Sequence, residues 1–194
     1  MDEYTYADPS AWEDWQREYR FGAFFIFPPL GTIEPIDELR RTYDPRSAAY
    51  CQAHLSLSEP LSGPLTRAQR GEVEVVLSSV APLDLHYGPL RTFPPYPGVT
   101  YAIQPEGPFM QLRSALHATT LFSGVPLTRQ EIAPHLTIAE FITVERTEEL
   151  FRELSGRVPE GTFLCESIKY AVPNQDFYFE RVLTLPLGRE DPDC

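Results

Sequence analysis

Short apolar runs, interrupted by prolines and polar turns, form the pattern of this sequence. Residues 21–27 are an aromatic and β-branched run that stops at Pro28, which predicts a buried strand. Because the 20 prolines end helices and avoid central strands, every element should be short. Further strands are expected at 52–58, 99–103, 134–142, 162–171 and 177–185, the last two as a hairpin around Pro173 and Asn174.

Apolar residues at helical spacing predict helices between these strands. In the segment 66–79, Val73, Val76 and Leu77 recur as on the core-facing side of a helix, and Thr66 can accept a backbone N–H in the first turn. Three more helices are expected at 35–43, 109–119 and 145–154. Short strands that alternate with short helices favour an α+β domain.

The chain length of 194 residues suits one domain with a substantial hydrophobic core. We expect this domain at 21–188, after an N-terminal extension at 1–20 and before a C-terminal tail at 189–194. In the extension, Ser10 is expected to cap a short helix that carries Trp12 and Trp15 on one side.

Composition excludes several classes of protein. The apolar fraction of 42% and aromatic fraction of 12% favour a globular fold over an acidic disordered chain. The net charge of −12 argues against contact with long duplex nucleic acid, but allows a local site for one small anion. Neither a signal peptide nor a membrane-length apolar run is present, so we expect a cytoplasmic protein without membrane contact. Cys51, Cys165 and Cys194 form no C-x-x-C pair, which disfavours a disulfide framework and a zinc ribbon.

One short motif occurs twice in equivalent surroundings. His54-Leu55-Ser56-Leu57 recurs as His135-Leu136-Thr137-Ile138, at a separation of 135 − 54 = 81 residues, and each copy precedes a predicted helix. Since side chains alternate along a strand, the aliphatic residues of each copy should enter the core. His54, Ser56, His135 and Thr137 should then face a common cleft between two related halves.

These four side chains match the needs of phosphoester cleavage. Two histidines can supply one general base and one general acid near neutral pH, and two hydroxyls can donate to the non-bridging oxygens of a phosphodiester. This chemistry requires no metal or other cofactor. Two alternatives are a structural role, which we also expect for His86 and His117, and zinc binding, for which neither H-x-H nor H-E-x-x-H spacing nor a third ligand is evident.

The motif pair resembles that of the 2H phosphoesterases, which include the 2′-5′ RNA ligase-like proteins and cyclic nucleotide phosphodiesterases. The resemblance extends over about 21–188 and includes the aromatic first strand, the segment with Phe93 and 99–102, Pro134 before the second motif, and the ending Leu185-Pro186-Leu187. It implies a bilobal α+β fold with pseudo-two-fold symmetry, in which two antiparallel sheets face a central cleft and helices pack outside.

The resemblance also implies an activity. The family opens 2′,3′-cyclic phosphates of nucleotides or RNA ends to 2′-phosphates, or reversibly forms 2′-5′ RNA linkages. His54 and His135 would be the acid and base, in an order that stays open, and Ser56 and Thr137 would bind the phosphate. We expect a monomer acting on a small cyclic nucleotide or an RNA end.

A catalytically silent module that binds a nucleotide or an RNA end in the same cleft is the alternative function. Other candidate ligands are less specific. Arg91, Arg113 and Arg129 are candidate phosphate partners, although an ordinary surface arginine is the favoured interpretation for each. Aromatic residues near predicted strand ends could stack on a base, although most should be core or lip residues; they are Tyr50, Tyr87, Phe93, Tyr96, Tyr101 and Tyr170.

Overall fold

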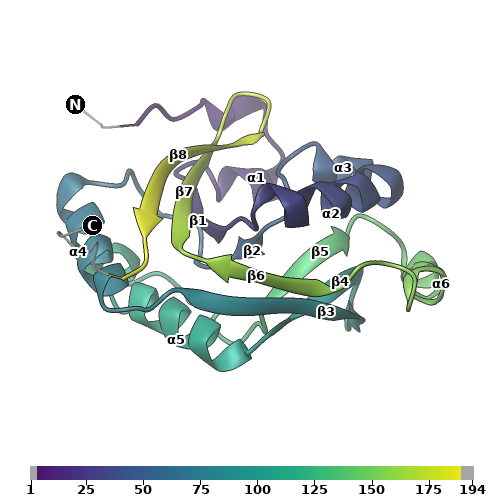
Figure 1. Cartoon of the computed structure of the whole chain (residues 1–194). Coiled ribbons are helices and arrows are strands. Elements are labelled where there is room, and N and C mark those ends of the chain that lie inside the picture. Colours follow the sequence, from purple (N-terminus) through teal and green to yellow (C-terminus); the bar gives the residue numbers. More distant parts are fainter. Residues whose placement is uncertain (1–3, 189–194) are drawn as a thin grey trace.

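In the computed structural model, which describes residues 4–188, these residues form two four-stranded antiparallel sheets (Figure 1). One sheet has the strand order β2-β1-β7-β8 and the other β5-β4-β3-β6. The strands are β1 (Ala23–Ile26), β2 (Leu55–Ser56), β3 (Leu83–Phe93), β4 (Tyr96–Gln104), β5 (His135–Ala139), β6 (Gly161–Cys165), β7 (Ser167–Pro173) and β8 (Phe179–Pro186). The α-helices are α1 (Asp14–Arg17), α2 (Leu30–Tyr43), α3 (Pro45–Ala48), α4 (Arg67–Ser78), α5 (Glu106–His117) and α6 (Val144–Leu154). Short 3₁₀ helices occupy Pro9–Ala11 and Thr120–Phe122.

The two halves of the domain repeat one order of elements. The first half runs β1, α2, β2 and α4, and the second runs β4, α5, β5 and α6. In each sheet the strand with the H-x-[ST]-x motif is an edge strand, paired with the strand that opens its half. Because β2 and β5 also contact each other, the two edges meet and bring the motifs together. The predicted α+β class with two antiparallel sheets is confirmed.

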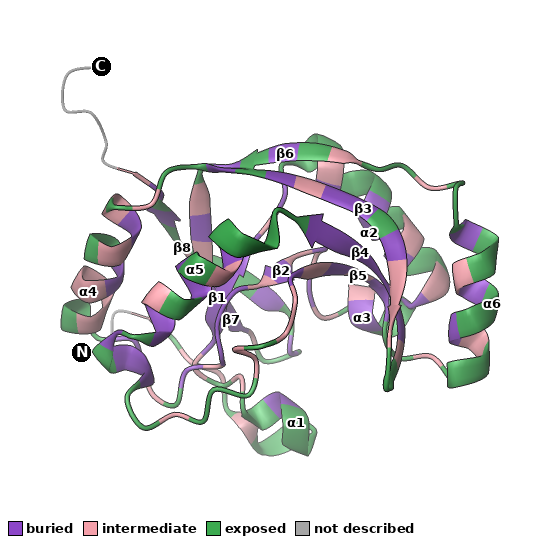
Figure 2. Ribbon diagram, turned by 90° about the horizontal axis from the view of Figure 1, so that it is seen from below, coloured by how far each residue is buried: buried purple, intermediate pink, exposed green. Residues whose placement is uncertain are grey.

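Helices cover the sheets on their outer sides, as predicted. Figure 2 shows α4 and α6 with buried residues turned toward the sheets and exposed residues turned outward. The α4 helix starts as expected, since the Thr66 hydroxyl accepts from the Gln69 N–H at 3.3 Å and the Gln69 side chain accepts from the Thr66 N–H at 3.1 Å. Val73 and Leu77 on its inner side are buried.

The predicted single strand at 162–171 is wrong, because the chain changes sheets within it. Cys165 pairs with Leu83 of β3, whereas Ser167 pairs with Pro186 of β8. The buried positions are Phe163 and Cys165 before Glu166 and Ile168 and Tyr170 after it, so the alternation shifts by one residue at the crossing, a signal that the single-strand prediction overlooked. The hairpin of β7 and β8 around Pro173 is confirmed.

Three larger differences from expectation concern β3, the strand at 52–58 and the helix at 35–43. The strand β3 was not predicted: Leu83, Leu85 and Tyr87 alternate as in a strand, but Pro89 interrupts the run at an irregularity in the pairing with β4. The predicted strand 52–58 is reduced to Leu55–Ser56, since the Ala53 N–H donates to the Asp37 carboxylate at 2.7 Å. The helix predicted to start at Pro35 starts at Leu30 and contains that proline.

The N-terminal extension is ordered differently from the prediction. Ser10 caps no helix; its N–H instead donates to Asp8, and Glu13 and Gln16 form the capping box of α1. The predicted tail 189–194, with Cys194, lies outside the described residues. Within residues 4–188, Cys51 and Cys165 are free buried thiols. No helix in that range is long and apolar enough to cross a membrane.

Candidate active site

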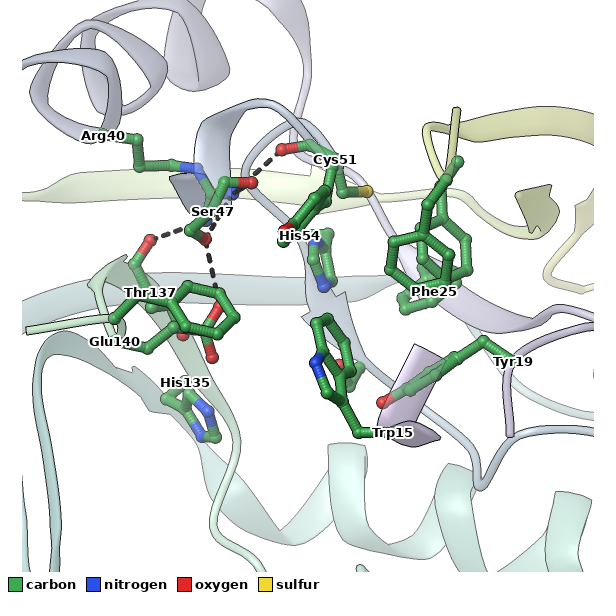
Figure 3. Close-up of a pocket in the computed structure, with 15 residues that line it drawn as sticks. Trp15, Tyr19, Phe25, Arg40, Ser47, Cys51, His54, His135, Thr137 and Glu140 are labelled. Atoms are coloured by element: carbon green, nitrogen blue, oxygen red, sulfur yellow. Dashed lines mark hydrogen bonds between the residues drawn. The ribbon is translucent and has the colours of Figure 1, made fainter. Parts of the chain in front are cut away.

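The alternation along β2 and β5 places the predicted site residues as expected. Leu55, Leu57, Leu136 and Ile138 are fully buried in the core. His54, Ser56, His135 and Thr137 are half-buried, and all four line one cavity of about 320 Å³ (Figure 3). The structure thus brings together all four residues singled out from the sequence.

This cavity adjoins a second one of about 420 Å³. We call the first the aromatic cavity, because its lining includes Trp15, Tyr19, Phe25, Tyr50, Phe141, Phe177 and Phe179. We call the second the arginine cavity, because Arg113 and Arg129 line it. The residues common to both are Tyr19, Ser56, His135, Thr137, Glu140 and Phe141. Three of the four motif residues, Ser56, His135 and Thr137, therefore lie where the two cavities of one cleft join, whereas His54 lines the aromatic cavity alone.

The two imidazoles are oriented by equivalent hydrogen bonds. Nδ1 of His54 lies 2.7 Å from the Gln52 carbonyl oxygen, and Nδ1 of His135 lies 2.9 Å from that of Ala133. Since a carbonyl oxygen only accepts, each Nδ1 carries the proton, and Nε2 of the neutral ring keeps its lone pair. Each ring also packs on a phenylalanine, Phe25 or Phe93, at a centroid distance of 4.8 Å.

Burial favours the neutral form of both histidines. It lowers the pKa of His54 to about 3, with a smaller contribution from the Arg40 guanidinium, and it also lowers the pKa of His135. Both rings are therefore able to accept a proton at neutral pH. An anionic phosphate beside them raises the pKa of an imidazole, which allows one of the two to act as the acid.

Arg40 on α2 joins the two motifs through backbone carbonyls. Its side chain is 1% exposed, and it donates to the carbonyl of Thr137 at 3.0 Å and to that of Cys51 at 2.9 Å. It also lies 3.4 Å from the carboxylate of Asp37, which accepts from the Ala53 N–H. Arg40 thus connects Cys51, which precedes the first motif, with Thr137 of the second motif.

Arg113 on α5 makes the reciprocal connection. Its side chain is 3% exposed, and it donates to the carbonyls of Ser56 and Arg129, both at 2.9 Å, and to the Ile132 carbonyl. Arg129 and Ile132 precede the second motif, whereas Ser56 belongs to the first. Arg40 of the first half therefore binds the Thr137 carbonyl of the second motif, and Arg113 of the second half binds the Ser56 carbonyl of the first motif. These two bonds fix the motifs relative to each other.

A carboxyl group that the sequence analysis did not identify also faces the cleft. Glu140 follows β5 and lines both cavities, and its side chain accepts from the Ser47 hydroxyl at 3.0 Å. Burial raises the pKa of Glu140, which decreases its negative charge near a bound phosphate. The buried carboxylate of Asp44 accepts from the N–H groups of Glu140 and Phe141, so this end of β5 is held rigidly.

The three candidate arginines have different roles. Arg113 holds carbonyls, as described above, and Arg91 donates to the Pro134 carbonyl at 3.1 Å. Arg129 lies over the Tyr19 ring at 5.2 Å, and among the described residues its buried Nη1 has no hydrogen-bond partner. Within residues 4–188 the buried Nε of Arg91 has no partner either, but Arg91 lines neither cavity, so Arg129 is the candidate arginine that offers an unpaired donor to the cleft.

The aromatic candidates divide evenly between cleft and core. Tyr50 lines the aromatic cavity, and Phe93 and Tyr96 line the arginine cavity. The other three, Tyr87, Tyr101 and Tyr170, are buried in the core. The first three are therefore residues at the cleft and the last three are core residues, in line with the expectation that most of the six are core or lip residues.

Sequence reasoning missed Trp15, Tyr19 and Arg40. A signal existed for Arg40, because it continues the apolar spacing of Ile33 and Ile36, and a charged residue in a core-facing stripe needs buried partners. The two aromatic residues belong to the extension, whose position depends on contacts with distant segments.

The remaining histidine with described partners is structural. Nδ1 of His117 lies 2.7 Å from the side-chain oxygen of Gln130, and Nε2 of His117 accepts from the Glu59 N–H. His117 lines neither cavity. Among residues 4–188, no three His, Cys, Asp or Glu side chains gather closely enough to hold a metal ion.

Two half-domains that each present a histidine and a hydroxyl to one cleft define the class of the protein, a 2H phosphoesterase. The sequence model of the 2′-5′ RNA ligase superfamily matches residues 28–176, and the chain belongs to this family. No curated protein sequence matches.

Solved structures share the fold at low sequence identity. E. coli LigT complexed with 3′-AMP is 16% identical, with a TM-score of 0.57 over 86% of this chain and 97% of that chain. TT0787 of Thermus thermophilus is 15% identical, with a TM-score of 0.55 over 87% of this chain and 98% of that chain. These similarities establish the LigT-like fold.

Proposed function

We propose that this protein is a metal-independent phosphodiesterase that hydrolyses 2′,3′-cyclic phosphates of nucleotides or RNA ends to 2′-phosphates. The observation that carries the proposal is the pairing of His54 with Ser56 and of His135 with Thr137 around one cavity, with matched hydrogen bonds at both Nδ1 atoms. His54 and His135 are the proposed acid and base, and Ser56 and Thr137 the proposed phosphate ligands.

The reaction requires both histidines. One neutral Nε2 accepts a proton from water as the water oxygen forms a bond to phosphorus. The bond from phosphorus to the 3′ oxygen breaks, and the other imidazole, protonated beside the bound phosphate, donates its proton to that oxygen. The Ser56 and Thr137 hydroxyls donate to the non-bridging oxygens, where negative charge increases in the transition state. The 2′-phosphate leaves as product.

The charge distribution supports a small substrate. The chain has a net charge of −12, which opposes binding along a nucleic-acid backbone. The cleft has locally favourable charges, since Arg40 lines the aromatic cavity and Arg113 and Arg129 line the arginine cavity. A single cyclic phosphate on a mononucleotide or an RNA end fits this contrast better than a duplex.

Related structures support nucleotide binding. LigT has been crystallised with 3′-AMP, with NADP⁺ and with ATP, so a protein of this fold binds nucleotides. One chain of the present protein carries both motifs, so the proposed reaction needs no second subunit, and we propose a monomer that acts in the cytoplasm.

The test is incubation with the four nucleoside 2′,3′-cyclic monophosphates and a short RNA with a cyclic phosphate end, in the presence of EDTA. We expect 2′-phosphate products under chelation. His54→Ala and His135→Ala should each lower the turnover by about 10²- to 10⁴-fold without unfolding the protein. Addition of an RNA with a 5′-hydroxyl tests the reverse, ligase-like reaction.

Two results would overturn this assignment. Near-normal turnover in either histidine variant would exclude the two-histidine mechanism. Binding of nucleotides without any turnover would instead identify the catalytically silent binding module.

A further inference from the structure

The N-terminal segment, residues 4–20, lies outside the family match at 28–176 yet is fixed on the domain. The Tyr6 hydroxyl lies 3.3 Å from the Tyr170 hydroxyl and accepts from the Leu65 N–H at 3.1 Å. Trp12 is 5% exposed, and its indole N–H donates to the Gln175 carbonyl at 3.0 Å. Contacts with three distant parts of the chain therefore determine where α1 lies.

This anchoring places Trp15 of α1 in the wall of the aromatic cavity. Trp15 is 37% exposed, and Figure 3 shows its indole directed into the cavity that holds the two imidazoles. Its ring centroid lies 5.8 Å from Tyr50, 5.9 Å from Phe141 and 5.3 Å from Phe177. The two tryptophans thus have different roles: Trp12 holds the segment, and Trp15 contributes ring surface to the cleft.

The polar edge of the Trp15 indole is already paired. Its Nε1 donates to the Glu13 carboxylate at 2.8 Å, and the same carboxylate pairs with Arg46 at 2.8 Å. The Arg46 guanidinium in turn lies over the Phe141 ring at 4.3 Å. What Trp15 offers to the cavity is therefore an aromatic surface with no unsatisfied donor, which suits the flat face of a nucleobase.

The separation of the cleft into an aromatic and an arginine cavity also favours a nucleobase beside Trp15. The cavity of about 320 Å³ is within the ~300–1,000 Å³ range of small-molecule sites, and its rings lie beside the proposed phosphate ligands Ser56 and Thr137. A base attached to a ribose phosphate bound there can reach this aromatic wall, whereas the neighbouring arginine cavity suits anionic groups.

We propose that the N-terminal segment provides the nucleobase subsite, in which the base of the substrate's terminal nucleotide stacks on Trp15. This inference rests on the proposed function, because it assumes that the phosphate binds between the motifs. Stacking uses the π face that all bases share, so the subsite should accept all four bases with little discrimination.

The experiment compares a base-bearing substrate with a base-free one. Adenosine 2′,3′-cyclic phosphate and 1-O-methylribose 2,3-cyclic phosphate are assayed with the wild type, Trp15→Ala and Trp15→Phe. Tyr178→Ala is the matched control, because Tyr178 is also 37% exposed but lines neither the aromatic nor the arginine cavity.

Trp15→Ala should lower kcat/KM for the adenosine substrate by about 5- to 150-fold, mainly through KM, as expected for the loss of one stacked base. The loss should be confined to the base-bearing substrate, and Trp15→Phe should recover part of it. Equal losses on both substrates, or no loss on the adenosine substrate, would overturn the inference, the first by showing that Trp15 only supports the fold of the cleft.

A failure of the proposed function gives a different result. If the wild type hydrolyses neither substrate, the binding of 2′-AMP and of ribose 2-phosphate is measured by calorimetry with the same variants. A Trp15→Ala effect on 2′-AMP alone then supports the base subsite without the enzyme assignment. Equal or absent effects on the two ligands refute it.

Discussion

Replacement of Arg113 by methionine tests whether the reciprocal arginine bridges hold the two motifs in place. Methionine is similar in length and fills the apolar path along α5, but it has no donor. The change leaves the partly buried carbonyl oxygens of Ser56 and Arg129 without the guanidinium that now donates to each at 2.9 Å. Burial lowers the pKa of Arg113 only to about 10, so the side chain that is removed is charged at neutral pH.

A loss of about 3 kcal/mol in the free energy of unfolding is expected. Each hydrogen bond from a charged donor contributes about 1.5 kcal/mol at the low end of its range, and both of these bonds are 2.9 Å long. In a domain of this size, that loss corresponds to a decrease of roughly 6–12 °C in Tm. If the Ser56 backbone moves as well, the turnover falls by up to about 10²-fold, because the hydroxyl is displaced from the phosphate.

Urea unfolding followed by circular dichroism, together with turnover of a cyclic mononucleotide, measures both effects. Arg152→Met is the control, since Arg152 is an exposed residue of α6 whose Nε donates only within its own helix, to the Glu148 carbonyl. Its effect should stay within about 0.5 kcal/mol. If Arg113→Met costs less than about 1 kcal/mol, or stabilises the protein, the penalty of burying the guanidinium outweighs its bonds, and the reasoning is refuted.

Three further measurements test the site. Because burial lowers the pKa of His54 to about 3, the unfolded chain, with a pKa near 6.5, binds a proton that the folded chain does not; the free energy of unfolding should therefore fall as the pH drops from about 6.5 toward 3. In urea titrations over this range, the free energy of unfolding should fall less steeply with pH in His54→Gln than in the wild type. Equal pH dependence in the two proteins would contradict the lowered pKa of His54. Thr137→Val should lower kcat by about 10²-fold, whereas Thr137→Ser should retain most of it, because only serine keeps the hydroxyl. The bond from Arg40 to the backbone carbonyl of residue 137 persists in both variants, so equal kinetics in the two would exclude a phosphate-binding hydroxyl. Arg129→Gln should raise the Kd for inorganic phosphate about tenfold, as measured by calorimetry, since the unpartnered Nη1 is lost, and an unchanged Kd would show that Arg129 serves only to pack on Tyr19.

Local pattern predicted most helices and missed the strands whose pairing decides their limits. The helix α4 starts at Thr66 as expected, because its cap and its apolar stripe depend on residues within two turns. The strand β3 was not predicted, although Leu83 and Leu85 alternate, since Pro89 breaks the run and only the pairing with β4 and β6 continues it. The alternation shifts by one residue at Glu166, between β6 and β7, but only the tertiary structure decides that β6 pairs with β3 and β7 with β1 and β8.

The sequence by itself determined the repeated motifs and the face that each side chain takes, because strand alternation is a local property and an 81-residue repeat is visible without coordinates. The tertiary structure decided which groups surround those motifs. Arg113 was a candidate phosphate ligand in the sequence, but it is buried and donates to the carbonyls of Leu57, Ser56, Arg129 and Ile132, so it connects the two halves instead. The placement of Trp15 depended on contacts of Tyr6 and Trp12 with segments more than 50 residues away, so it follows only from the folded chain.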